Sequence, residues 1–223
     1  MEPNSTPKQK AFLIHGTSLG VTYSVFRPSN LDYCCFNLCK DEIDNQTHTL
    51  FRWNQFDNKF TFLETINPLT TIKIFLKERE YISSYIAHKA LFDAINKAKP
   101  SVIISHSLGG NYLLQTLNNF GVPDCVRKIV FLVSEMPRDL VLDNHDLIKR
   151  IDDLSLVIEN YYCYYDPTLL SSYFLTGHLT SGNFGTKSKH IKNKFYPLTL
   201  SKFKDPHTSI LRDKKLFEML INR

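Results

Sequence analysis

The sequence predicts an α/β domain built on one mostly parallel β-sheet. Short apolar runs of strand length alternate along the chain with longer stretches in which apolar residues recur at helical spacing. The 223 residues, of which 43% are hydrophobic and 22% charged, are enough for a single domain with a substantial core. We therefore expect about six strands in one sheet, with helices on both faces of it.

Six segments have the composition of strands, because they are short, rich in β-branched or aromatic residues and bounded by polar residues, glycine or proline. They span residues 11–16, 49–53, 101–105, 128–133, 160–165 and 194–200. The first is expected to end in a turn at Gly16. Pro197 cannot donate a ladder hydrogen bond, so it places the last strand at an edge of the sheet. The fifth contains four tyrosines that are expected to pack alternately along the strand: Tyr161, Tyr162, Tyr164 and Tyr165.

Four stretches are predicted to be wholly or partly helical from the spacing of their apolar residues. A long amphipathic helix is expected over residues 72–98, and a second over residues 108–120, where Gly121 ends it. Residues 143–153 are expected to be helical or irregular, and residues 208–222 to form a closing helix.

The polar residues 1–10 are expected to form a disordered or extended segment before a single domain of residues 11–223. The apolar run that follows them is too short for a signal peptide or a membrane span, so we expect a cytoplasmic protein without stable membrane insertion. The net charge of +5 is not accompanied by a stripe of basic and aromatic residues, so no nucleic-acid partner is expected. The sequence leaves the oligomeric state open.

The five cysteines favour a reducing compartment, because their number is odd and the chain is large enough to fold without disulfides. Cys34, Cys35 and Cys39 lie close together, but no second Cys or His pair offers the spacing of a zinc site. We expect these three thiols to be partly buried and inert. We expect no metal and no organic cofactor.

Residues with catalytic chemistry follow four of the predicted strands. The first strand ends in His15–Thr17, the third in Ser105–Ser107, the fifth in Asp166, and the last is followed by His207. The carboxyl ends of parallel strands meet at one edge of the sheet, where ligands bind in α/β proteins, so these residues are expected to converge.

Serine, aspartate and histidine in this order can serve as nucleophile, acid and base. A serine hydroxyl is a weak nucleophile unless a histidine takes its proton, and a carboxylate behind the histidine fixes its tautomer. The oxyanion that forms needs backbone N–H donors, and a sharp strand-to-helix turn can supply one. From this chemistry alone, either Ser105 or Ser107 could be the nucleophile.

The segment Ser105–Gly109, SHSLG, resembles the nucleophile elbow Gly-x-Ser-x-Gly of the α/β-hydrolase superfamily. The resemblance identifies Ser107 as the nucleophile, with Gly109 two residues further on, and leaves Ser105 where glycine is usual. It implies that His106 packs beside the elbow.

The His15-Gly16 pair after the first strand is similar to the oxyanion-loop motif of the same superfamily. The resemblance implies that the backbone N–H groups of Thr17 and Leu108 form the oxyanion hole. The histidine of the pair is expected to support this loop through hydrogen bonds. By the same resemblance, Asp166 is the acid of a catalytic triad and His207 is its base.

Other residues are alternatives for two of these roles. Asp139 and Asp143 follow the preceding strand, where some members of the superfamily place the acid. His178 and His190 are alternative bases, although both precede the last strand.

The resemblance covers nearly the whole chain and implies an α/β-hydrolase fold and a serine esterase. The expected reaction is cleavage of a carboxylic ester or thioester of a small acyl substrate through an acyl-Ser107 intermediate. The alternatives are an amidase or an acyltransferase with the same triad, or a catalytically silent binding protein on the same fold. Because the connection 134–159 is short, the lid is expected to be small or absent.

Overall fold

The computed structural model describes residues 10–17, 36–53, 68–197 and 206–222 of the chain. Within these ranges the strands form one six-stranded sheet in the order β2-β1-β3-β4-β5-β6, and every neighbouring pair is parallel. This confirms the α/β class, the parallel sheet and the number of strands. The strands are β1 (Ala11–Ile14), β2 (His48–Phe51), β3 (Val102–His106), β4 (Lys128–Leu132), β5 (Val157–Tyr162) and β6 (Lys192–Phe195).

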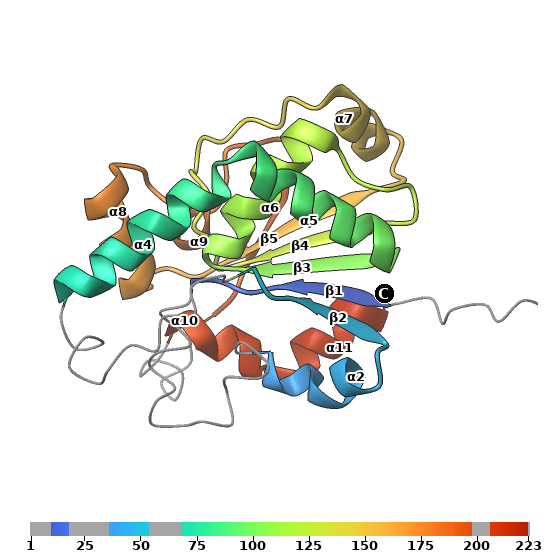
Figure 1. Ribbon diagram of the computed structural model, residues 1–223, viewed down its shortest axis with the longest axis horizontal. Helices are drawn as coiled ribbons and strands as arrows, with labels where there is room; N and C mark the ends of the chain where they lie inside the picture. The colour runs from blue at the N-terminus through green and yellow to red at the C-terminus, as the bar shows by residue number, and fades with distance from the viewer. Residues whose placement is uncertain (1–9, 18–35, 54–67, 198–205, 223) are drawn as a thin grey trace, which may run out of the picture.

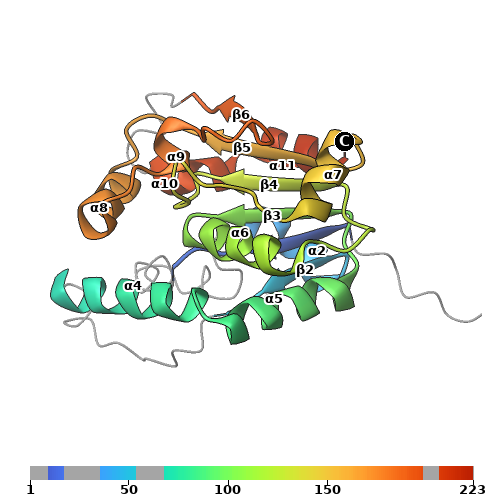
Figure 2. The same ribbon diagram turned by 90° about the horizontal axis from the view of Figure 1, so that it is seen from above.

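Helices cover both faces of the sheet (Figures 1 and 2). One face carries α4 (Pro68–Ile82), α5 (Tyr85–Ala98), α6 (Leu108–Phe120) and α7 (His145–Asp152). The other carries η3 (Asn37–Cys39), α2 (Lys40–Asp44), α10 (Pro206–Ser209), η5 (Ile210–Arg212) and α11 (Lys214–Asn222). Two further helices, α8 (Pro167–Thr176) and α9 (Ser181–Phe184), lie at the carboxyl end of the sheet.

The sheet divides the core into two apolar layers. Along β1, Phe12 and Ile14 pack with the α5–α6 layer, whereas Ala11 and Leu13 pack with the α11 layer. This alternation is the two-residue period of a strand, and all four side chains are buried because helices cover both faces. The continuous apolar run in the sequence is therefore explained by burial on two sides.

The long helix expected over residues 72–98 is wrong, because the structure has two helices there, α4 and α5. The break falls at Ser84, whose backbone is extended and whose side chain accepts a hydrogen bond from the N–H of Ala87 at 3.2 Å. A serine in this position caps a new helix, and this local hydrogen bond outweighs the continuing apolar period.

The single closing helix expected over residues 208–222 is also wrong, since α10, η5 and α11 follow one another there. Asp213 separates the last two with an extended backbone, and its carboxylate accepts a hydrogen bond from the N–H of Leu216 at 3.1 Å. The physical cause is again a capping side chain inside an apolar period.

Strand β5 begins and ends three residues before the segment 160–165 that the sequence predicts. Its register runs alongside β4 from Val157 to Tyr161, so Tyr164 and Tyr165 lie beyond the sheet. They are 45% and 77% exposed, and the expectation that they pack along the strand is wrong.

Strand β6 lies at an edge of the sheet, as the proline at position 197 predicts, but it begins two residues earlier than expected. Residues 198–200 of that prediction lie outside the described ranges, as do residues 1–9 of the N-terminal segment and two of the clustered cysteines, Cys34 and Cys35.

The connection 134–159 contains one helix, α7, which lies at the end of the sheet opposite to α8 (Figure 1). It therefore does not cover the carboxyl edge. In the part of the chain that the structure describes, no helix is both long and apolar enough to cross a membrane.

The first turn of α6 packs so closely on β1 that only glycine fits at position 109. A Cβ atom there would overlap the His15 carbonyl oxygen and would lie 3.0 Å from that of Ile14. We expect Gly109→Ala to lower the free energy of unfolding by about 3 kcal/mol, because backbone cannot move aside as a side chain can.

The matched control is Gly177→Ala, since a Cβ at Gly177 meets no atom within 4 Å and is disfavoured only by the φ of +72°. This variant is expected to lose about 1 kcal/mol. Urea denaturation measures both values, and equal losses would contradict the close approach of α6 and β1.

Candidate active site

Ser107 stands alone between β3 and α6 in a strained conformation. Its φ of 53° and ψ of −127° lie in a region that residues other than glycine rarely adopt, at a cost on the order of 1–3 kcal/mol. Its N–H donates to the carbonyl oxygen of Leu132 at 3.2 Å, and its own carbonyl oxygen accepts from the N–H of Glu135 at 3.0 Å. The end of β4 thus holds the turn in place.

The turn after β1 lies directly against the side chain of Ser107. A Cβ atom built on Gly16 would lie 2.8 Å from the Cβ of Ser107 and 3.3 Å from its Oγ. Thr17 follows Gly16, and Leu108 is the first residue of α6, where backbone N–H groups have no partner within the helix. The turn that precedes Thr17 and the first residue of α6 therefore both lie beside Ser107.

His207 and Asp166 contact each other across the carboxyl end of the sheet. Nδ1 of His207 lies 2.6 Å from Oδ2 of Asp166, and the two side chains are 12% and 0% exposed. When Nδ1–H donates to the carboxylate, the lone pair of a neutral imidazole lies on Nε2. The aspartate that the sequence singled out is thus the one that orients this histidine.

Asp166 divides its two carboxylate oxygens between a histidine and a helix. It is the N-cap of α8, and its Oδ1 accepts hydrogen bonds from the N–H groups of Thr168 at 2.9 Å and Leu169 at 3.3 Å. Burial alone would raise the pKa of Asp166, but His207 and these two amides outweigh it and hold the pKa below its ordinary value. The carboxylate is therefore ionised at neutral pH.

His106 connects the elbow to His207. Its Nε2–H donates to the carbonyl oxygen of His207 at 3.0 Å, and the two rings lie 4.7 Å apart. Burial, together with the nearby His207, lowers the pKa of His106 to about 3. It lies beside the turn at Ser107 and stays uncharged.

His15 fixes the turn after β1. Its Nδ1–H donates to the carbonyl oxygen of Gly16 at 2.7 Å, while its ring stacks on Trp53 at 5.2 Å. The indole N–H of Trp53 donates in turn to the carbonyl oxygen of His15 at 3.1 Å. Burial lowers the pKa of His15 to about 4, so it acts as a neutral support for the loop.

Ser105 lies within β3, where its hydroxyl donates to the carbonyl oxygen of Val130 at 3.3 Å. It is buried, and its backbone belongs to the strand ladder with β1 and β4. The strain of the elbow is therefore located at Ser107 and not at the position where the superfamily has glycine.

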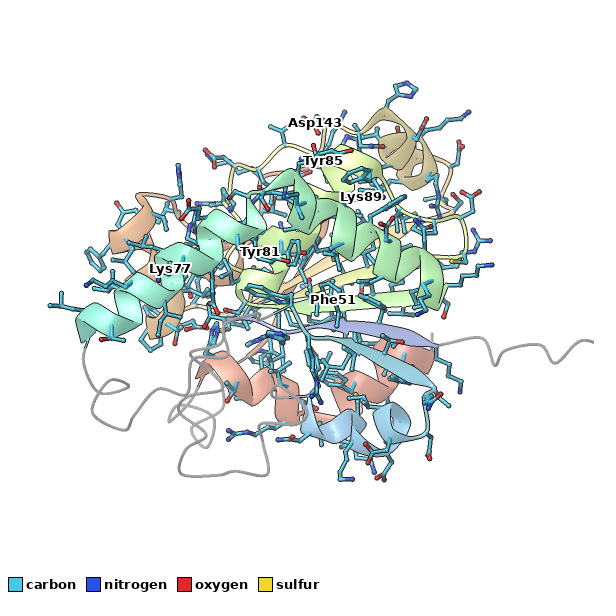
Figure 3. The ribbon with its side chains drawn as sticks, viewed as in Figure 1. Phe51, Lys77, Tyr81, Tyr85, Lys89 and Asp143 are labelled. Atoms are coloured by element: carbon cyan, nitrogen blue, oxygen red, sulfur yellow. The ribbon has the colours of Figure 1, made fainter. Side chains whose placement is uncertain are left out.

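The alternative acids and bases lie elsewhere. Asp139 and Asp143 are exposed, and Asp143 lies on the face of the sheet opposite to α10 (Figure 3). His190 pairs with Asp152 of α7 at 3.6 Å, and His178 is exposed after α8. The structure brings none of these four alternatives into the contact that His207 makes with Asp166.

Glu135 is a buried residue of this region that the sequence analysis missed. Its carboxylate binds the guanidinium of Arg79, the hydroxyl of Ser172 at 2.7 Å and the amide of Asn111 at 3.3 Å. Burial raises the pKa of Glu135, and these three donors offset only part of that effect. An acidic residue in the short segment that follows buried β4 is the signal that could have found it.

The described residues include no cluster of three or more His, Cys, Asp or Glu side chains that could hold a metal ion. Cys39 and Cys163 are buried free thiols, and burial raises the pKa of each to about 12. They are therefore protonated and poorly nucleophilic at neutral pH.

Comparison of the sequence with models of protein families found no match, and no curated protein matches it.

The contact of Asp166 with His207 predicts how the free energy of unfolding depends on pH. A group whose pKa is depressed by folding stabilises the fold above its ordinary pKa, here 3.8, and this contribution is lost as the pH falls. We expect Asp166→Asn to unfold more easily than the wild type at pH 6, because asparagine keeps the cap on α8 but not the charge toward His207. The difference should shrink below pH 4 in urea denaturation.

Asp139→Asn serves as the control, because Asp139 is exposed. It is expected to change the free energy of unfolding by less than about 0.5 kcal/mol at either pH. A difference between wild type and Asp166→Asn that does not depend on pH would contradict an ionised Asp166.

Proposed function

We propose that the protein is a serine hydrolase that cleaves a carboxylic ester or thioester through an acyl-Ser107 intermediate. The observation that carries the proposal is the meeting of two features at one sheet edge. One is the strained serine between β3 and α6, and the other is the His207–Asp166 pair, which His106 connects to that serine. We place this chemistry on an α/β-hydrolase fold.

The conformation of Ser107 supports a chemical role for its hydroxyl. A turn with φ of 53° would be less strained with glycine than with serine. A catalytically silent fold would gain stability from that replacement. The serine at this position therefore favours an enzyme over a binding protein.

In the proposed reaction the hydroxyl of Ser107 attacks the acyl carbon while Nε2 of His207 takes its proton. Asp166 holds the imidazole through Nδ1 and stabilises the imidazolium that forms. The imidazolium then gives the proton to the departing alcohol or thiol. Water attacks the acyl-serine in the same way, which releases the acid and restores Ser107.

The developing oxyanion is assigned to the backbone N–H groups of Thr17 and Leu108. The N-terminus of α6 adds its partial positive charge on the same side. Loss of one such donor typically costs about 3 kcal/mol in the transition state.

The composition of α8, whose N-cap is Asp166, favours a substrate with an apolar acyl group. No residue of α8 is charged, and Phe174 is 83% exposed, with Tyr173 and Leu175 beside it. These side chains follow the triad acid by about two helical turns. An amidase, or an acyltransferase that passes the acyl group to an acceptor other than water, would use the same triad. Experiments are therefore needed to distinguish an esterase from these two enzymes.

A fluorophosphonate probe tests the nucleophile directly, because it phosphonylates only an activated serine. We expect one label per wild-type chain and none on Ser107→Ala. Hydrolysis of p-nitrophenyl esters should fall on the order of 10⁴-fold or more in that variant. Ser105→Ala is the matched control and should keep both the label and most of the activity.

A folded wild-type chain that takes up no label would contradict the proposal and favour the silent binding protein. Equal labelling of Ser107→Ala would move the nucleophile to another serine. Esters of increasing chain length, compared with the corresponding thioesters and anilides, then define the acyl group and the leaving group.

A further inference from the structure

The turn Thr180–Phe184, which contains α9, joins the carboxyl ends of β4 and β5. The two chains are paired up to the N–H of Val133, which donates to the carbonyl oxygen of Tyr161 at 2.9 Å. Beyond that point the N–H of Gly182 donates to the carbonyl oxygen of Ser134, and its carbonyl oxygen accepts from the N–H of Cys163, both at 2.9 Å. One residue of the turn thus bridges the two strand ends.

Only glycine fits at the centre of this bridge. A Cβ atom on Gly182 would lie 2.5 Å from the carbonyl carbon of Val133 and 2.6 Å from the nitrogen of Ser134. Because backbone packs on backbone here, the position of the next residue, Asn183, is fixed by the sheet.

Asn183 holds the main chain of Asp166 from both sides. Its Oδ1 accepts a hydrogen bond from the N–H of Asp166 at 3.0 Å, and its Nδ2 donates to the carbonyl oxygen of Asp166 at 3.2 Å. The side chain is 1% exposed, so water does not compete for these bonds.

Asp166 needs such an anchor, because it lies beyond the end of β5 at the start of α8. The hydrogen bonds that its Oδ1 accepts come from Thr168 and Leu169, which belong to that same helix. A tilt of α8 would carry Asp166 and these two residues together, away from His207. Asn183 ties Asp166 to the ends of β4 and β5 instead.

We propose that Asn183 is a positioning residue that holds the carboxylate of Asp166 at bonding distance from Nδ1 of His207. The effect of Asn183 on the reaction rate rests on the proposed function, because a displaced Asp166 slows catalysis only if His207 is the base. The contact itself does not depend on any activity.

The contact is tested by NMR on the protein without substrate. Nδ1 of His207 lies 2.6 Å from Oδ2 of Asp166. The proton in this short hydrogen bond is expected to give a far-downfield signal in the wild type. Asp166→Asn identifies that signal by its loss. We expect the signal to move upfield or broaden in Asn183→Ala.

Kinetics on p-nitrophenyl esters give the second readout. In Asn183→Ala we expect kcat to fall about 10- to 100-fold with KM unchanged within about two-fold, since a misplaced catalytic group affects the chemical step. Asn183→Asp keeps the acceptor for the N–H of Asp166 and is used in both measurements if Asn183→Ala does not fold.

Asn193→Ala is a closely matched control. Asn193 binds the N–H and the carbonyl oxygen of Thr186 at 2.8 and 2.7 Å, as Asn183 binds those of Asp166, but it lies on β6 and its Oδ1 also accepts from Nδ2 of Asn160 at 3.2 Å. The Asn193→Ala variant should show the same signal and the same kcat as the wild type. Equal losses in the two asparagine variants would show a general effect on the fold and overturn the proposal.

A folded Asn183→Ala chain with the signal and kcat of the wild type would also overturn it. A wild-type chain that shows the signal but hydrolyses no ester contradicts the proposed function alone. In that case the NMR comparison still decides the role of Asn183.

Discussion

The site depends on the direct packing of the first turn of α6 against the backbone at the end of β1 and against Ser134, which follows β4. A Cβ at Gly109 would overlap the carbonyl oxygen of His15, and one at Gly110 would overlap the side chain of Ser134. Because α6 packs so closely on these residues, the chain has no room for a relaxed turn between β3 and α6. Ser107 absorbs the constraint with a positive φ, and its side chain is directed at the turn after β1.

Buried polar side chains organise the rest of this edge of the sheet. Glu135 joins α4, α6 and α8 through Arg79, Asn111 and Ser172, and its own N–H binds the carbonyl oxygen of Ser107. A buried ion pair adds little net stability, since both charges lose their hydration, but its directional bonds leave few alternative arrangements. We infer that Glu135 and its three partners hold α4, α6 and α8 in fixed positions relative to the turn at Ser107.

The sequence predicted the elements whose patterns are local, and it failed where a distant contact decides. The apolar runs of β1 and β3 and the glycine after α6 place those elements correctly. The break at Ser84 was missed because a capping serine and a continuing helix share the same apolar period. The tyrosine-rich run has strand propensity over its whole length, and only pairing with β4 selects its first half. Glu135 and Asn183 were missed because their partners are distant in the chain and carry no motif.

Burial also distinguishes the three histidines at this edge of the sheet. Burial lowers the pKa of His15 to about 4 and that of His106 to about 3, and the nearby Asp166 offsets only part of this effect at His106. Neither accepts a proton at neutral pH, so both act as neutral donors to carbonyl oxygens. His207 alone among these three lies at hydrogen-bonding distance from a buried carboxylate, that of Asp166. This contact, which the other two histidines lack, singles out His207 as the candidate base.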